Sequence, residues 1–228
     1  MDTFPITKID QKNEFTIEPF STAEHYPAPA SIALNLGALA MKFAHVERSP
    51  RYDETRREND VEHSYMLALV ANELAALLYP NLEAGKVTQF AIVHDLPETV
   101  TGDVKTFQFT NEQMAAKHAV EQNAMDGLIQ TLPSYTAELL TAYEQQEVPE
   151  ARFVKAVDKL LPVIVDILGA GKKVMNEDYG VTTSDELQAS HNKLHSRIAN
   201  SFEEFPPLVN AHNLLCKLFQ IEFETTTR

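Results

Sequence analysis

A histidine-aspartate pair, His94-Asp95, directly follows the apolar run FAIV at residues 90–93. Both side chains therefore enter surroundings in which an unpaired polar or charged group is unfavourable. A divalent metal ion is an efficient partner for an imidazole and a carboxylate together. The dipeptide alone is weak support for metal binding, so the rest of the chain has to supply further ligands.

Two more side chains have the same character. His63 lies on an otherwise apolar segment, and Asp158 lies in FVKAVDKLLPVIV, where a lone carboxylate is otherwise hard to explain. With His94 and Asp95 they form a set of two imidazoles and two carboxylates. This mixed set suits Mn, Co, Fe or Zn better than Ca, and on an octahedral ion it leaves positions for water and substrate. The sequence therefore predicts a site for a single divalent metal ion.

Two acidic residues follow the pair closely. Glu98 comes four residues after His94 and three after Asp95, so on a continuing helix the three side chains share one face. A carboxylate there is placed to orient or deprotonate a metal water. Asp103 follows Gly102 just beyond the expected helix end, where we expect it to contact the substrate or protonate the leaving oxygen.

The elements that must position these residues are predicted to be helices. Apolar residues recur at helical spacing and alternating β-branched runs are scarce, so the fold class is predicted to be all-α. Pro97 removes one helical hydrogen bond and is expected to kink its helix. The densely charged residues 47–60 are predicted to be a functional loop, and 179–183 is the best strand candidate. The expected helices span residues 32–44, 61–79, 83–99, 111–131, 134–146, 150–168, 184–200 and 208–223.

A chain of 228 residues, 44% of them hydrophobic, is long enough to bury a full core. We expect an irregular, proline-rich N-terminal arm over residues 1–30 and a core over 31–170. Residues 171–228 are expected to be a helical C-terminal extension packed on that core. The single cysteine, Cys216, excludes an internal disulfide and a multi-cysteine zinc site, and it is expected to be a buried thiol.

The charge balance restricts the partners. Nineteen basic against 33 acidic residues give a net charge of −14, which argues against binding to a nucleic-acid polymer or an anionic membrane. A small phosphorylated substrate is still compatible, because a bound metal ion reverses the local field. The sequence shows neither a run of about 18 apolar residues nor a secretory signal, so a cytoplasmic location is expected.

The order of these residues resembles the H…HD…D pattern of the HD-domain metal-dependent phosphohydrolases. The likeness is greatest to the bacterial 5′-deoxynucleotidase branch, with the pattern R-W-P…E-N-x-x-E-H-S…H-D-x-x-E-x-x-T-G-D…D. The matching residues here are Arg48-Ser49-Pro50, Glu58-Asn59, Glu62-His63-Ser64, His94-Asp95, Glu98, Thr101-Gly102-Asp103 and Asp158. The resemblance covers about residues 34–165.

The resemblance implies a helical bundle that hydrolyses phosphate esters of nucleotides, most closely (deoxy)nucleoside 5′-monophosphates, and that forms a homodimer. Glu98 would activate or orient water, and Asp103 would lie at the sugar or leaving-group side. Arg48 would hold the substrate phosphate, because a planar guanidinium matches phosphate oxygens. The ligands of one divalent ion, whether Co, Mn, Mg, Zn or Fe, would be His63, His94, Asp95 and Asp158.

One departure from the family pattern leaves the substrate open. The tryptophan that follows the arginine is Ser49 here, and the chain has no tryptophan. A dNTP phosphohydrolase is therefore an alternative, and Lys155 is a candidate contact of the substrate phosphate. A nucleotide-binding regulatory protein is a third possibility, although no metal ligand is missing. The basic residues available for a longer phosphate chain are Lys42, Arg51, Arg56, Arg57, Lys105 and Lys155.

Two other patterns are assigned no function. His191 and His195 form an i, i+4 pair without carboxylates nearby in an apolar context, and we expect them on an exposed helix face. The run GAGKK at 169–173 resembles a phosphate loop, but it lacks the required spacing and the serine or threonine.

Overall fold

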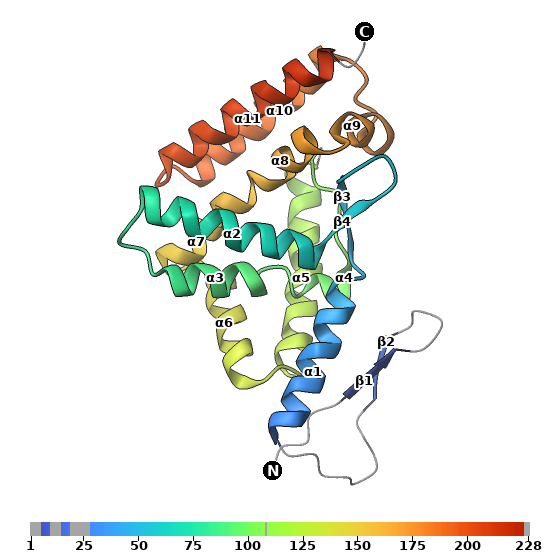
Figure 1. Ribbon diagram of the computed structural model, residues 1–228, viewed down its shortest axis with the longest axis vertical. Helices are drawn as coiled ribbons and strands as arrows, with labels where there is room; N and C mark the ends of the chain where they lie inside the picture. The colour runs from blue at the N-terminus through green and yellow to red at the C-terminus, as the bar shows by residue number, and fades with distance from the viewer. Residues whose placement is uncertain (1–5, 10–14, 19–27, 108, 226–228) are drawn as a thin grey trace.

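The computed structural model describes residues 6–9, 15–18, 28–107 and 109–225, and Figure 1 shows that helices dominate it. The all-α prediction is confirmed. The helices are α1 (Ala28–Phe43), α2 (Asp60–Leu78), α3 (Ala84–Val93), α4 (Glu98–Thr101), α5 (Asn111–Ile129), α6 (Ser134–Gln145), α7 (Pro149–Asp158), α8 (Leu161–Leu168), α9 (Gly171–Tyr179), α10 (Ser184–Ser201) and α11 (Pro206–Thr225). None of the described helices is both long and apolar enough to cross a lipid bilayer.

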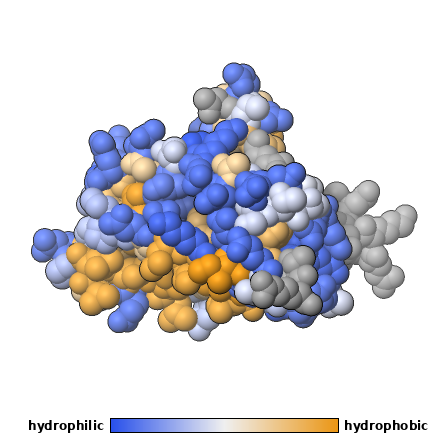
Figure 2. All heavy atoms as spheres, turned by 90° about the horizontal axis from the view of Figure 1, so that it is seen from above, coloured by the Kyte–Doolittle hydropathy of each residue, from blue (hydrophilic) through white to orange (hydrophobic). Residues whose placement is uncertain are grey.

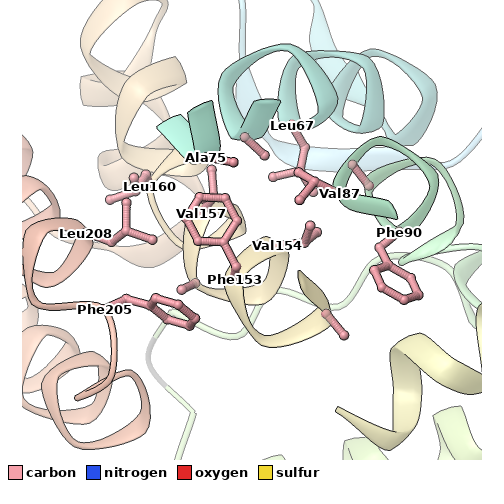
Figure 3. Packing of buried hydrophobic residues seen from close by; sticks show 14 of the residues in the cluster. Leu67, Ala75, Val87, Phe90, Phe153, Val154, Val157, Leu160, Phe205 and Leu208 are labelled. Atoms are coloured by element: carbon pink, nitrogen blue, oxygen red, sulfur yellow. The ribbon is translucent and has the colours of Figure 1, made fainter. Parts of the chain in front are cut away.

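The central core lies where α2, α3 and α7 pack together, and the C-terminal helices contribute to it. A fully buried large apolar side chain contributes about 1.5–3 kcal/mol. This core therefore fixes the relative positions of the helices that carry or precede the predicted metal ligands. Figure 3 shows Leu67, Ala75, Val87, Phe90, Phe153, Val154, Val157, Leu160, Phe205 and Leu208 meeting in it.

The start of α2 is set by its own residues. The Asn59 side chain accepts from the Glu62 backbone N–H at 3.0 Å, and the Glu62 carboxylate accepts from the Asn59 N–H at 3.2 Å. This capping box satisfies two backbone donors at the helix start. His63, Leu67 and Ala71 are all buried and recur at helical spacing, so His63 lies on the core-facing side of α2.

Two helices that the sequence predicts as continuous are interrupted by proline. The predicted helix 83–99 ends at Val93, because Pro97 has no N–H to donate to the Val93 carbonyl. Residues 94–97 form turns, and the short α4 follows. The predicted helix 150–168 is likewise divided into α7 and α8, because Pro162 has no N–H to donate to the Asp158 carbonyl. Both breaks occur beside predicted metal ligands.

The prediction of a loop over 47–60 is wrong. Strands β3 (Glu47–Arg51) and β4 (Arg57–Asn59) pair antiparallel there, with Glu47 opposite Asn59, Arg51 opposite Arg57, and an irregularity between them. Charged residues of this hairpin pair with one another, as Arg48 does with the fully buried Glu58 at 3.3 Å. The hairpin therefore lacks the apolar alternation that signals a strand.

The N-terminal arm also differs from the irregular structure expected over residues 1–30. Strands β1 (Ile6–Ile9) and β2 (Phe15–Glu18) form an antiparallel pair that lies near α1, and α1 itself begins at Ala28 (Figure 1). The other residues of the predicted arm lie outside the described residues. Residues 6–9 and 15–18 therefore form a strand pair that their composition does not reveal.

The segment between α8 and α10 contains a helix, α9, that the sequence analysis did not predict, and the strand expected over 179–183 is absent. Two glycines allow the close packing at its start. A Cβ on Gly169 would lie 2.1 Å from the Arg51 carbonyl oxygen, and one on Gly171 would lie 2.4 Å from that of Asp166. The Ala170 N–H donates to the same Arg51 oxygen at 3.0 Å. These glycines therefore have a packing role.

Candidate metal centre and substrate cleft

The four predicted metal ligands converge from three parts of the chain. His63 comes from α2, His94 and Asp95 follow α3, and Asp158 ends α7. His63 Nε2 lies 2.9 Å from Asp158 Oδ1 and 3.9 Å from Asp95 Oδ2. His94 Nε2 lies 2.8 Å from Asp95 Oδ2 and 4.0 Å from Asp158 Oδ1. Neighbouring ligands of one first-row ion stand about 3 Å apart, so this spacing suits a single ion.

The hydrogen bonds of the two histidines favour a cation between them. His94 Nδ1 lies 2.9 Å from the Ala91 carbonyl oxygen, which can only accept, so Nδ1 carries the proton. In the neutral ring the Nε2 lone pair then faces the carboxylate oxygens, two sets of acceptors that repel each other unless a cation lies between them, and Nε2 has no hydrogen-bond partner among the described residues. Glu58 Oε2 lies 3.5 Å from His63 Nδ1 and orients that ring. A carboxylate behind a histidine in this way is common at metal sites.

The electrostatics also fit a divalent ion. Asp60, Asp95 and Glu98 bring carboxylate oxygens within 4.8 Å of one another. Burial and the neighbouring Asp95 raise the pKa of Glu98 to about 11, although Arg48 opposes the shift. Burial likewise raises the pKa of Asp60 to about 7. The site therefore holds more carboxylates than its own cations neutralise, and a divalent ion would relieve this repulsion.

Arg48 lies inside this carboxylate cluster. Its Nη1 is 2.8 Å from Asp95 Oδ2, 3.0 Å from Asp60 Oδ1 and 3.7 Å from Glu98 Oε2. The side chain is only 10% exposed, and it also pairs with Glu58. The predicted phosphate ligand is thus at the site, with its donors engaged by carboxylates. A contact with substrate phosphate stays a prediction.

A cleft of about 670 Å³ opens beside the metal centre and includes His94, Asp95, Glu98 and Asp158 in its wall. Lys155 lies in this cleft rather than on a purely solvent-facing side of α7. Burial lowers the pKa of Lys155, and the neighbouring Lys159 adds to the effect. The basic residues of the wall are Lys117, Lys155, Lys159, Arg152 and Arg197.

Two of these lysines lie against acidic groups of the site. Lys159 Nζ is 2.6 Å from Asp158 Oδ2, and Lys117 Nζ is 4.0 Å from Glu98 Oε1. The sequence analysis did not predict Lys117 as a site residue, because α5 carries no recognisable motif and Lys117 approaches Glu98 only through a tertiary contact. It also did not predict Asp60, which the sequence marks only as the residue after Glu58-Asn59 at the start of a helix.

Asp103 lines a smaller cavity of about 170 Å³ that shares Asp158 and Lys159 with the cleft. Gly102 before it has φ 70°, a conformation that favours glycine. The turn brings Asp103 to β3, where the Ser49 backbone N–H donates to its carboxylate. Asp103 is therefore beside Arg48 and Ser49, on a different wall from Lys155.

The other predicted side chains divide into several groups. Cys216 is 4% exposed, so the prediction of a buried thiol is confirmed. The exposed helix face predicted for His191 and His195 is wrong, since His191 is 5% exposed and His195 is half-buried. His191 packs against Phe219 of α11 with ring centroids 6.0 Å apart, a contact that local spacing does not predict.

Six basic residues were candidates for contact with a longer phosphate chain of the substrate. Of these, Lys155 lines the cleft and Lys105 lines the smaller cavity. Arg51, Arg56 and Arg57 pair with carboxylates elsewhere, and Lys42 lies on α1.

Comparison with known proteins gives three relevant similarities. The family model for the HD domain matches residues 40–203, across the core boundary predicted at residue 170. The chain is 34% identical over 136 residues to a 5′-deoxynucleotidase of Erwinia tasmaniensis, covering 52% of this chain and 67% of that protein. It is 33% identical over 133 residues to a 5′-deoxynucleotidase of Enterobacter sp. strain 638, with the same coverage.

A similar fold is found in the crystal structure of a predicted metal-dependent phosphohydrolase from Magnetospirillum magnetotacticum. The TM-score is 0.63 at 26% sequence identity, and the match covers 86% of this chain and 96% of that one. The likeness therefore extends beyond the segment shared with the two deoxynucleotidases.

Proposed function

The chain belongs to the HD domain family of metal-dependent phosphohydrolases, and from this premise we propose that it hydrolyses (deoxy)nucleoside 5′-monophosphates to nucleoside and phosphate. The convergence of the two histidines and two aspartates beside Glu98, in a cleft lined by lysines, carries the proposal. Two relatives named 5′-deoxynucleotidases support the choice of substrate.

His63, His94, Asp95 and Asp158 would hold one divalent ion. When bound, the ion supplies Lewis-acid polarisation of a phosphoryl oxygen and neutralises negative charge. Its identity among Co, Mn, Mg, Zn and Fe is part of the proposal to be tested.

The other residues are assigned roles by their positions. With the divalent ion bound, the repulsion that raises the pKa of Glu98 is offset, and the Glu98 carboxylate accepts a proton from the attacking water and aims it. Asp103 supports the leaving ester oxygen or the sugar, and Arg48 holds phosphate by exchanging one carboxylate contact for a phosphate oxygen. Lys155 adds positive charge on the cleft wall, where fixed charge stabilises a phosphoryl-transfer transition state.

A product screen tests the proposal. The purified protein is incubated with each ribo- and deoxynucleoside mono-, di- and triphosphate and with Mn, Co, Mg or Zn, and the products are separated by chromatography. We expect nucleoside and inorganic phosphate from monophosphates. Hydrolysis that survives in both His94→Ala and Asp158→Ala would show a contaminating enzyme. Absence of hydrolysis with every metal would contradict the proposal and favour a nucleotide-binding regulatory protein.

A dNTP phosphohydrolase is the second candidate, because five basic residues line the cleft. For this function we expect release of triphosphate, diphosphate or successive phosphates in the same screen. Lys155→Ala should then raise the KM for triphosphates about tenfold, roughly the loss of one charge-assisted contact. Lys193→Ala, on the exposed side of α10, is the matched control.

We also propose the homodimer that the resemblance implies. Figure 2 shows apolar residues gathered along one side of the molecule in that view. Exposed apolar side chains recur on α2 (Tyr65, Leu69 and Leu77) and on α11 (Leu214, Leu218 and Ile221). Light scattering of the full chain is expected to give twice the mass of one chain, and a monomer at all concentrations would contradict the proposal. The cytoplasmic location stays a prediction.

A further inference from the structure

Lys117 of α5 is a residue of the cleft wall that the proposed mechanism does not use. Its Nζ lies 4.0 Å from Glu98 Oε1, and Glu121, one turn further along α5, holds the same ammonium group in an ion pair. The Lys117 side chain is only 16% exposed, and all three residues line the cleft. A surface lysine normally keeps its charged end in water. The Lys117 ammonium group instead lies between two carboxylates beside the metal centre.

The carboxylate of Glu98 depends on tertiary contacts for its orientation. Glu98 begins α4, a helix of only four residues between the turn at 94–97 and Gly102. A single helical turn is held weakly by its own hydrogen bonds, and α4 is supported by packing against α5 and α1. Oε2 of Glu98 has no hydrogen-bond partner among the described residues. The direction of this flexible side chain is therefore set by the charged groups around it.

Two cations from different elements face the two oxygens of Glu98. Arg48 Nη1 of β3 lies 3.7 Å from Oε2, and Lys117 Nζ of α5 lies 4.0 Å from Oε1. Both distances are longer than a direct hydrogen bond, so the attraction is ionic, and burial leaves it weakly screened. Arg48 is shared with Asp60 and Asp95 at shorter distances. Of the two cations, Lys117 is the one that contacts no predicted metal ligand in the described part of the chain.

Resting on the proposed function, we propose that Lys117 is a positioning residue, which fixes the Glu98 carboxylate in the orientation from which Glu98 activates water. Glu121 in turn holds Lys117 in place. Contacts from α5 on one oxygen and from β3 on the other set the rotation of the carboxylate group. A misplacement of about 1 Å lowers the rate of a reaction by up to about 10²-fold. The loss of one contact is therefore expected to appear in kcat.

Steady-state kinetics of the Mn-loaded protein test this role. Lys117→Met removes the charge with little change in side-chain length, and Lys117→Arg keeps the charge. The substrates are nucleoside 5′-monophosphates and p-nitrophenyl phosphate, whose hydrolysis requires no recognition of a nucleoside. We expect Lys117→Met to lower kcat about tenfold or more, within the range for a misplaced reacting group, and to leave KM unchanged. Lys117→Arg should restore most of kcat. Lys193→Met, exposed on α10, is the matched control and should keep both constants.

A double-mutant cycle with Glu98 separates positioning from a merely structural role. If Lys117 acts through Glu98, Lys117→Met should cause no further loss of kcat in a Glu98→Gln background. Equal losses in the two backgrounds would overturn the inference, because Lys117 would then act independently of Glu98. A rise in KM with unchanged kcat would also overturn it, and would indicate that Lys117 contacts the substrate phosphate.

Crystal structures of the Mn-loaded wild type, Lys117→Met and Lys117→Arg give a readout that does not depend on turnover. The Glu98 carboxylate is expected in one orientation in the wild type and Lys117→Arg, and turned away or divided between two orientations in Lys117→Met. An unchanged Glu98 side chain in Lys117→Met would overturn the inference. If Lys117→Met does not fold, Glu121→Gln takes its place. It removes the ion pair that holds Lys117, and it should lower kcat and shift Glu98 in the same direction.

The outcomes separate the two proposals. Hydrolysis of p-nitrophenyl phosphate but of no nucleotide would refute the proposed function, and kcat for p-nitrophenyl phosphate would then decide the role of Lys117. Absence of all hydrolysis would also refute the proposed function, and the orientation of Glu98 in the three crystal structures would decide the inference. Nucleotide hydrolysis with undiminished kcat in Lys117→Met would refute the inference alone.

Discussion

Arg48 donates to Asp95 Oδ2 at 2.8 Å, and the same oxygen faces His94 Nε2 at 2.8 Å. One carboxylate oxygen thereby joins the β3–β4 hairpin to the metal centre. The same guanidinium also reaches Glu58 and Asp60, both fully buried. Arg48 is consequently the cation that holds several buried carboxylates near one another.

Replacement of Arg48 is therefore expected to destabilise the fold. Arg48→Ala leaves Glu58 and Asp60 buried without their cation, and removing one partner of a buried pair typically lowers the free energy of unfolding by about 3–5 kcal/mol. Urea denaturation of the metal-free protein measures the change. Arg56→Ala is the control, since its pair with Glu62 is exposed and is expected to contribute about 0–1 kcal/mol. A loss below about 1 kcal/mol in Arg48→Ala would refute this role.

Removal of the metal should also lower stability. An ion that binds only the folded state adds about 2.7 kcal/mol to the free energy of unfolding at 100 times its Kd. Chelation followed by addition of Mn or Co is expected to lower and then restore the Tm. His94→Ala should bind less metal, measured by mass spectrometry, and lose the Tm response. His118→Ala, whose side chain is 64% exposed on the cleft wall, should keep both. An identical Tm response in the two variants would contradict the ligand assignment.

Glu98 is expected to matter for turnover and not for metal content. It lies near the metal centre without belonging to the four converging ligands, and a positioned general base contributes about 10²–10⁴-fold to the rate. Glu98→Ala should retain the metal and lose most turnover, whereas Asp95→Ala should lose both. Glu73→Ala, on the exposed side of α2, is the matched control. Near-normal turnover by metal-loaded Glu98→Ala would show that another group activates the water.

Asp178 provides a stability prediction that depends on pH. Burial opposes ionisation of this carboxylate, but hydrogen bonds from Arg57 at 2.8 Å and Lys105 at 2.7 Å lower its pKa to about 2. Because the folded-state pKa lies below the ordinary aspartate value of 3.8, the stabilisation is present above pH 4 and is lost as the pH falls towards 2. Asp178→Asn should therefore lower the free energy of unfolding by about 1–3 kcal/mol at pH 7.

The pH series distinguishes this ion pair from a packing effect. The difference between wild type and Asp178→Asn in urea titrations should be constant from pH 7 to 5 and should shrink below pH 4. A difference that stays the same at pH 3 would mean that the carboxylate charge does not stabilise the fold. Asp185→Asn, exposed on α10, is expected to change little at any pH.

The sequence predicted the helical class and the side chains that gather at the centre. An imidazole or carboxylate inside an apolar run needs a partner wherever the chain folds, so His63, His94, Asp95 and Asp158 could be chosen without coordinates. Glu98 was chosen by helical spacing. The helix in fact breaks at Pro97, and the turn at residues 94–97 still brings Glu98 to the cluster.

Features that depend on contacts between distant segments were missed. The β3–β4 hairpin is polar, so its strands give no apolar alternation, and its charges are satisfied by each other and by Asp95 and Asp60. His191 was expected in solvent because its neighbours in sequence are polar, but Phe219 and Phe107 cover it. Neither the hairpin nor the burial of His191 can be predicted from a stretch of about ten or twenty residues of sequence.

The sequence by itself thus determined which chemistry this protein carries, because ligand types, apolar periodicity and proline positions act over a few residues. Only the tertiary structure decided how the side chains that carry this chemistry are arranged around the cleft. The packing of α2, α3 and α7 sets the distances among the four predicted ligands, and α8, α9 and α10 contribute walls to the smaller cavity that Asp166 lines. These distances arise from core burial across the whole chain, and local spacing cannot encode them.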